Sequence, residues 1–439
     1  MENVEVCRKR KCADIENLSR EELVRRIMQL ESHVKQLQNV ISKEAASPVR
    51  QQKPFNFKRF KKRHVALKFL YLGWLYDGYV VQEDTANTVE AVLFEALLRT
   101  KLVESRETSN YHRCGRTDKG VSAFSQTISI DLRSNLSEGP GIITPENYTP
   151  DAKSESRTRE IEYVKILNGV LPQEIRVLAW APVDPTFSAR FDCKQRTYRY
   201  FFPQGNLDLE CMRQGAALLV GEHDFRNLCK MDVGNGVTNF VRNILSTRLY
   251  KLVNQEGSGD GGNRGYTMWC LEIVGQAFLW HQVRCIVAVL FLIGRRLEEP
   301  QIISDLLDVE KNPRKPQYSM ASEIPLVLYD CQFEGFDWQY NVEELTLVTK
   351  QLQKLWTLMR VKSKILHSML LDIAAVPCMS ETCITSQADT LQPGTMPRVY
   401  KPLLERPLCE SLEERIEHFS KRRKPGGCDG DVADQQDDS

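Results

Sequence analysis

The chain has 439 residues, 42% of them apolar, and a formal net charge of +1. This length and composition allow at least one sizeable buried core and exclude a wholly disordered protein. The longest apolar run, residues 286–293, is too short to cross a bilayer, and the first residues are acidic rather than apolar. We therefore expect a soluble protein of the cell interior, neither secreted nor inserted in a membrane.

The cysteines and glycines exclude several cofactor sites. Thirteen cysteines are present, and none forms a Cys-x-x-Cys pair with a second such pair or a nearby histidine pair. The glycine-rich stretch 256–265 lacks the Lys-Ser/Thr that would follow in a phosphate loop, so it reads as a hairpin loop. The sequence thus predicts reduced thiols, no metal and no cofactor.

The N-terminal region contains a heptad pattern and a linker. Between residues 19 and 44 the apolar residues alternate at spacings of four and three: Leu23, Ile27, Leu30, Val34, Leu37 and Ile41. The pattern predicts a short coiled coil or one amphipathic helix lying on the main body, because fewer than three heptads self-associate only marginally. The coiled coil is slightly preferred. Residues 45–54, with two prolines, should form a linker.

The next part of the chain reads as strand, helix, loop and strand. We expect a strand near residues 65–71, a helix from Asn87 to Lys101 that Asn87 and Glu90 cap, and a second strand near 127–132. The stretch from Ser134 to Arg159, rich in polar residues, should be a long mobile insertion.

The second half predicts a similar succession of elements. Strands are expected at 175–180, 196–202, on both sides of 256–265 and through 269–274, with helices at 207–220, 282–293, 342–373 and 412–424. The predicted strands are more numerous than alternating strand–helix units of a parallel sheet would need. The predicted class is α+β with a mostly antiparallel sheet.

Asp118 is the candidate catalytic residue. It lies in a loop between Gly115 and Gly120, with Arg116 and Lys119 beside it. The glycines permit tight backbone geometry, and the two cations should keep the carboxylate ionised, as a nucleophile or base requires. Taken alone, an aspartate in such a loop more often caps a turn.

Three motifs resemble those of the TruA-like pseudouridine synthases. The run 115–121, Gly-Arg-Thr-Asp-Lys-Gly-Val, matches the family's catalytic signature, which implies that Asp118 is the catalytic residue. Residues 187–200 resemble the second motif, whose tyrosine packs against the target uracil and corresponds to Tyr198. Residues 277–284 resemble the third motif, whose arginine forms a salt bridge with the catalytic aspartate and corresponds to Arg284.

The resemblance covers residues 65–336 and implies a fold and a domain plan. The pseudouridine synthase fold would place residues 63–182 and 183–336 in two lobes that share a mostly antiparallel mixed sheet with flanking helices. The N-terminal coiled-coil helix and basic linker would occupy 1–62, and a helical extension with an acidic tail would occupy 337–439. Residues 111–118, 223–232 and 311–331 resemble the eukaryotic branch that modifies tRNA positions 38 and 39.

The resemblance also implies a substrate and an assembly. The substrate would be the anticodon stem-loop of tRNA, in which the enzyme isomerises uridine to pseudouridine, and the family forms two-fold homodimers. Basic residues beside the catalytic aspartate and before the first strand would contact RNA: Arg116, Lys119, Lys58, Arg59, Lys61, Lys62 and Arg63. A solvated linker is the alternative for the last five. Basic clusters also suggest nuclear import, so we expect the nucleus and the cytoplasm.

Two other functions compete with this prediction. A non-catalytic RNA-binding protein or tRNA chaperone on the same fold would retain Asp118 for structure alone. A carboxylate-dependent hydrolase would need a second acidic residue or metal ligands near Asp118, where the local sequence offers only cations. Whether Asp118 attacks C1′ or removes a proton from C2′ stays open.

Overall fold

The computed structural model describes residues 55–82, 85–150, 157–252, 266–376, 390–392 and 399–422. The chain divides into two units, Met1–Asn56 and Phe57–Ser439, and the second contains nearly all of the described residues. The predicted coiled coil at residues 19–44 lies outside them. Within the described ranges, no helix combines the length and the apolar character needed to cross a membrane.

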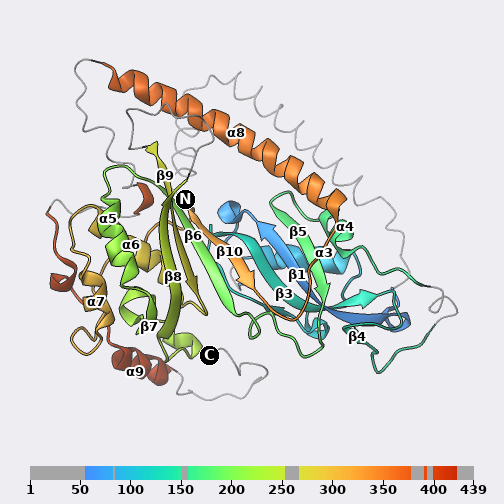
Figure 1. Ribbon diagram of the computed structural model, residues 1–439. Coiled ribbons are helices and arrows are strands. Elements are labelled where there is room, and N and C mark those ends of the chain that lie inside the picture. The colour runs from blue at the N-terminus through green and yellow to red at the C-terminus, as the bar shows by residue number, and fades with distance from the viewer. Residues whose placement is uncertain are drawn as a thin grey trace, which may run out of the picture. The chain divides into compact units, whose positions relative to one another are not determined.

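One sheet of eleven strands runs through the described part of the second unit (Figure 1). Its order is β11-β5-β1-β3-β10-β6-β9-β8-β7, with β2 paired to β3 and β4 to β1. Neighbours run antiparallel except β10 and β3, which are parallel, so the predicted mostly antiparallel mixed sheet is confirmed. The strands are β1 Lys61–Tyr71, β2 His112–Arg113, β3 Ser122–Ser134, β4 Ile142–Ile143, β5 Ile175–Pro182, β6 Gln195–Pro203, β7 Gly221–Asp224, β8 Val241–Lys251, β9 Met268–Gly275, β10 Leu326–Gln332 and β11 Gln339–Tyr340.

The contact between β3 and β10 joins the two predicted lobes. The predicted lobe boundary at residue 183 falls between β5 and β6, and the parallel pairing of Val327 with Ser122 connects strands from both sides of that boundary. Asp118 precedes β3, whereas Tyr198 lies on β6, the other neighbour of β10. The sheet therefore brings motifs that are far apart in sequence to neighbouring strands.

Helices pack on both faces of the sheet. They are α3 Val89–Arg99, α4 Tyr163–Asn168, α5 Leu209–Ala217, α6 Gln282–Gly294, α7 Ile302–Leu307, α8 Val342–Ala374 and α9 Leu412–Arg422. β1 is buried on both faces, since Leu67 belongs to the main core with Leu93 of α3, whereas Leu70 packs with Val348 of α8. Side chains of successive strand residues point to opposite faces, so one strand can serve both layers.

The start of α3 differs from the predicted cap. Thr88, not Asn87, is the N-cap, and its hydroxyl accepts a hydrogen bond from the amide of Ala91 at 3.3 Å. Glu90 was expected to close a capping box, but its carboxylate is buried and pairs with Arg106 at 2.9 Å. Burial of the carboxylate requires such a cationic partner, which the local capping pattern does not reveal.

The third motif opens α6, which is buried at every residue from Gln282 to Gly294. A helix was expected at residues 282–293, and the one found has no solvent-facing side. Arg284 is consequently buried in the first turn and is not part of a surface ion pair. A buried guanidinium must find polar partners, and it finds them at the candidate site.

Candidate active site

Asp118 lies in the loop between β2 and β3. Residues of β1 and of the segment that follows β1 hold this loop in place. The hydroxyls of Tyr71 and Thr117 are hydrogen-bonded at 2.7 Å, and the amide of Tyr79 donates to the Thr117 carbonyl at 3.0 Å. These contacts fix the residue immediately before Asp118. The loop is therefore anchored to the central strand rather than free to reorient.

Two glycines let the backbone adopt this arrangement. Gly120 has a φ of +79°, a conformation that side-chain-bearing residues rarely adopt. A Cβ on Gly73 would lie 1.9 Å from the carbonyl oxygen of Val121, so this position admits no side chain without a backbone shift. Of the two glycines predicted to shape the Asp118 loop, Gly120 has a backbone conformation that requires glycine, whereas a side chain at Gly115 would meet only Leu328 at 4.0 Å. Gly73 lets the preceding segment pack directly against the end of the loop.

Asp118 is surrounded by hydrogen-bond donors from the third motif. The indole Nε1 of Trp280 donates to its Oδ1 at 3.2 Å, while Nε2 of His281 lies 3.4 Å and Nη1 of Arg284 3.8 Å from its Oδ2. The Asp118 side chain is 24% exposed, so a substrate can still reach it. Lys230 lies over the Trp280 ring at 4.0 Å and adds positive charge nearby.

Burial and charge act in opposite directions on the Asp118 carboxyl. Burial raises its pKa above the ordinary value, while the Arg284 guanidinium and the Trp280 hydrogen bond lower it and Glu323 raises it. A partly buried carboxylate whose pKa departs from its usual range is a common feature of catalytic acids and bases. The arrangement suits a nucleophile or a general base.

His281 occupies an unusual position between Trp280 and α6. Its φ of +59° is left-handed, which histidine adopts more readily than most side chains, and among the described residues its Nδ1 is buried without a hydrogen-bond partner. Burial, with Arg284 and other cations nearby, lowers the pKa of His281 to about 3. The imidazole is thus neutral near pH 7, and its contact with Asp118 is not an ion pair.

The predicted salt bridge between Arg284 and Asp118 is present, and the guanidinium also has two other partners. Only Nη1 approaches Asp118, whereas Nε donates to the carbonyl of Ala321 at 2.9 Å and Nη2 to the carboxylate of Glu323 at 2.8 Å. The guanidinium therefore divides its nitrogens among three acceptors, which fixes its position more firmly than one carboxylate would.

Tyr198 reaches the site through an aromatic neighbour. It is buried on β6, and its ring meets that of Phe278 edge to face at 4.9 Å between centroids. Phe278 lies two residues before Trp280 in the third motif. The second and third motifs therefore meet beside the loop of the first, and burial raises the pKa of the Tyr198 phenol, which stays protonated.

Arg116 and Lys119 were predicted to keep Asp118 ionised, but the structure assigns this effect to another residue. The ammonium of Lys119 pairs with Asp77 at 2.7 Å, and Arg116 is exposed. The Lys119 charge is therefore engaged by another carboxylate, and neither cation is among the main influences on the pKa of Asp118. Arg284 supplies the opposing charge instead.

The basic linker divides into exposed and engaged residues. Lys58 and Arg59 are exposed in the short helix Phe57–Arg59, whereas the ammonium groups of Lys61 and Lys62 donate to backbone carbonyls at 2.8 and 2.7 Å. The structure removes Arg63 from the residues predicted to contact RNA, because its guanidinium is buried and pairs with Glu160 at 2.9 Å. A buried, paired arginine cannot present its charge to a phosphate.

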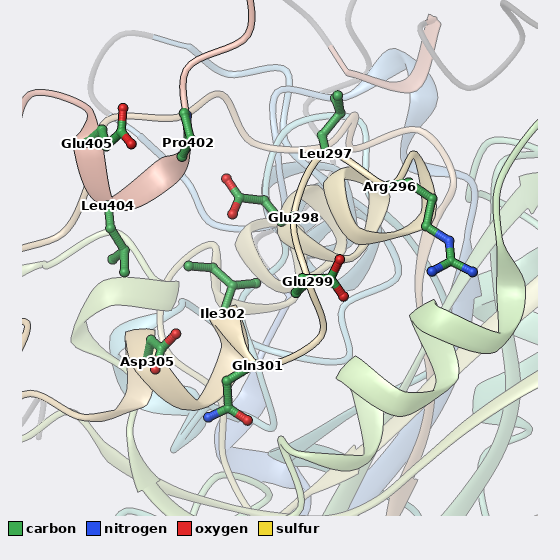
Figure 2. Close-up of a pocket in the computed structure, with 10 residues that line it drawn as sticks. All are labelled: Arg296, Leu297, Glu298, Glu299, Gln301, Ile302, Asp305, Pro402, Leu404 and Glu405. Atoms are coloured by element: carbon green, nitrogen blue, oxygen red, sulfur yellow. The ribbon is translucent and has the colours of Figure 1, made fainter.

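A pocket of about 410 Å³ lies away from these residues, beside α7 and the C-terminal segment (Figure 2). Four of its lining side chains are carboxylates: Glu298, Glu299, Asp305 and Glu405. Glu298 is already engaged, since it accepts a hydrogen bond from the amide of Leu403 at 2.7 Å. An acidic pocket repels phosphate, so Asp118, not this pocket, marks the candidate site.

Sequence reasoning missed several residues around Asp118. Trp280 and His281 lie within the third motif, but no function was predicted for them. Their position in that motif was the signal that could have identified them. Lys230 and Glu323 lay within the stretches that resembled the eukaryotic branch. Glu323 is the acidic neighbour that the local sequence lacked, and its carboxylate is bound to Arg284.

Known proteins resemble the chain along most of its length. A family profile described as "tRNA pseudouridine synthase" matches residues 216–334. Proteins named "tRNA pseudouridine(38/39) synthase" from Bos taurus and Homo sapiens are each 48% identical over 433 residues, covering 93% of this chain and 89% of the relative. The one from Saccharomyces cerevisiae is 42% identical over 361 residues, covering 76% and 77%. The chain therefore belongs to the TruA-like tRNA pseudouridine synthase family, whose members are isomerases.

Proposed function

We propose that this protein isomerises uridine to pseudouridine at positions 38 and 39 of tRNA, with Asp118 as its catalytic residue. The positions come from the names of its relatives. The observation that carries the residue assignment is the geometry of the carboxylate, which is partly buried and contacted by the Trp280 indole and the Arg284 guanidinium. In the family's signature, the same aspartate stands between two glycines.

The reaction needs an ionised carboxylate and no change of oxidation state. The uracil is detached from C1′, turns within the site and rejoins the ribose through its C5. Asp118 either attacks C1′ or removes the proton from C2′, and both routes start from the carboxylate. Arg284 and Trp280 favour that form against the effect of burial, which is the role we assign to both.

The target uridine must leave the base stack before Asp118 can reach it. Such enzymes flip the nucleotide into a pocket and read it by stacking and hydrogen bonds. Arg116, exposed two residues before Asp118, is placed to enter the vacancy and hold phosphate, because a guanidinium can stack and pair at once. Tyr198 and Phe278 would provide aromatic surface beside the flipped uracil.

An assay on defined RNA tests the proposal. We expect the purified protein to form pseudouridine in an unmodified tRNA transcript that carries U38 and U39, without added cofactor, as read by mass spectrometry of nuclease fragments. A transcript with cytidine at both positions is the control and should stay unmodified. Tight binding of the first transcript without any pseudouridine would support the alternative, a tRNA chaperone on the same fold.

We further propose that the enzyme is a homodimer and that the second half of α8 contributes to the contact between subunits. α8 begins beside α4 and β5, where Val348 is buried, and then continues as a long helix (Figure 1). From residue 356 to the end of the helix, seven apolar side chains are each more than half exposed: Trp356, Leu358, Val361, Ile365, Leu366, Met369 and Ile373. So much exposed apolar surface on one helix is typical of an interface.

Light scattering should separate the two candidate interfaces. If the main body supplies the contact, deleting residues 1–45 should leave a dimer with reduced tRNA affinity, and Ile365→Glu with Leu366→Glu should give monomers. The double change Ser363→Glu with Lys364→Glu, at exposed positions of the same helix that lie off this apolar face, is the matched control and should stay dimeric. A monomeric, fully active full-length protein would refute the dimer, and monomers formed only by the deletion would assign it to the N-terminal heptads.

The expected location also stays a proposal. We propose that the protein occurs in both the nucleus and the cytoplasm, on the basis of short basic clusters such as residues 8–11 and 421–424. Both clusters resemble import signals in composition. tRNA is available to a modifying enzyme in either compartment.

A further inference from the structure

Three cysteines from separate parts of the chain meet beneath the candidate active site. Cys114 directly precedes the Asp118 loop, Cys193 precedes β6, and Cys331 lies on β10. Their sulfur atoms all lie within 4.8 Å of one another, and all three residues are buried. No sequence pattern indicated this cluster, because the cysteines are more than 75 residues apart and none stands in a Cys-x-x-Cys pair.

The spacing of the sulfur atoms suits a thiophilic metal ion. Thiolates bound to one zinc ion at about 2.3 Å lie roughly 3.8 Å apart when the coordination is tetrahedral. Small rotations of the three side chains would therefore bring sulfurs that already lie within 4.8 Å to metal-binding distances. Soft thiolate ligands select Zn²⁺ and Cu⁺ over hard cations such as Mg²⁺.

A positive charge beside the cluster would balance the site. Arg196, which pairs with Cys331 across β6 and β10, donates from Nη2 to the backbone carbonyls of Cys114 at 2.9 Å and Arg190 at 3.0 Å. Among the described residues, no carboxylate lies within ion-pair distance of this guanidinium. Three thiolates carry a net charge of −1 with Zn²⁺, which Arg196 would neutralise, and of −2 with Cu⁺, which Arg196 would halve. Burial of ions is tolerated when their charges are compensated in this way.

We propose that Cys114, Cys193 and Cys331 form a structural binding site for a thiophilic metal ion. The ion would cross-link the segment before Asp118, the segment before β6 and the middle of β10. Tyr198 is two residues from Arg196 on the same strand. Metal binding at this point would therefore hold the first and second motifs in a fixed relation, without the ion taking part in the reaction. The inference does not depend on which uridine is modified.

Metal analysis of the full-length protein, purified under reducing conditions, tests the site. Elemental mass spectrometry should find about one zinc or copper ion per chain, and the element found distinguishes the two. Replacement of the metal with Cd²⁺ should produce thiolate-to-metal charge-transfer absorption. Cys193→Ser should weaken Cd²⁺ binding by at least about tenfold, since even the loss of residues that only support metal ligands costs 10- to 100-fold.

A second cysteine serves as the matched control. Cys270 is fully buried on β9 and stands outside the cluster, so Cys270→Ser should keep the metal content and the absorption of the wild type. If Cys193→Ser does not fold, the wild-type protein still tests the proposal, because removal of the metal with a chelator should lower the Tm of the wild type. The proposal would be overturned by any of three results. These are the absence of charge-transfer absorption in the wild type, equal Cd²⁺ affinity in Cys193→Ser and the wild type, and a disulfide within the cluster under reducing conditions.

Discussion

Asp118→Asn should lower the rate of pseudouridine formation by on the order of 10⁴-fold, the effect typical of removing a catalytic nucleophile or base. The amide has nearly the shape of the carboxylate and can still accept the hydrogen bond from Trp280. It cannot attack C1′ or accept a proton from C2′. Single-turnover measurement on an unmodified tRNA transcript gives the rate, and a filter-binding titration should give a tRNA affinity close to that of the wild type, since phosphate contacts carry binding.

The same variant should be at least as stable as the wild type. Burial raises the pKa of Asp118 above its unfolded value, so the folded state favours the protonated carboxyl. The stabilising contribution of this group is present below the unfolded pKa of 3.8 and is lost as pH rises through the folded pKa. At neutral pH the ionised group opposes folding, and asparagine removes that effect. An unchanged or higher Tm with lost activity separates catalysis from folding, whereas near-wild-type turnover would end the catalytic assignment.

The sequence predicted the candidate site where a motif fixes a residue by its neighbours in the chain. Asp118 lies in a glycine-bounded loop, and Arg284 approaches it from the first turn of α6. The partners of these residues were harder to predict. Lys119 pairs with Asp77, and Arg284 pairs with Glu323 as well as with Asp118. Such pairs could not be predicted, because contacts across the sheet depend on the order of the strands, which no local sequence pattern contains.

The fold was predicted best where periodicity extends over many residues. α8 was expected at residues 342–373 and is found at Val342–Ala374. α4 and α7 were not predicted, since six residues are too few for a helical period to stand out from a loop. The cysteine cluster could not be foreseen either, because its three residues come together only when β6 and β10 pair.

Arg284→Lys should lower the rate on the order of 100-fold, a loss comparable to that of one preorganised charge-stabilising donor. The guanidinium contacts Asp118, the Ala321 carbonyl and Glu323 with three different nitrogens. An ammonium group carries the same charge but cannot reach all three acceptors from one position. Arg213→Lys, which changes an exposed arginine paired with Glu210 on α5, is the matched control and should keep full activity.

The pH dependence of these variants distinguishes an electrostatic role for Arg284 from a structural one. Activity needs ionised Asp118, so it is lost as pH falls through the pKa of this carboxyl. Arg284 lowers that pKa and Glu323 raises it. Arg284→Lys, which moves the cation away, should therefore shift the acid limb of the pH–rate profile to higher pH. Glu323→Gln should shift it to lower pH. A structural role would reduce the rate and the Tm but leave the limb in place, and a lysine variant with full activity and an unmoved limb would show that Arg284 does not act on Asp118.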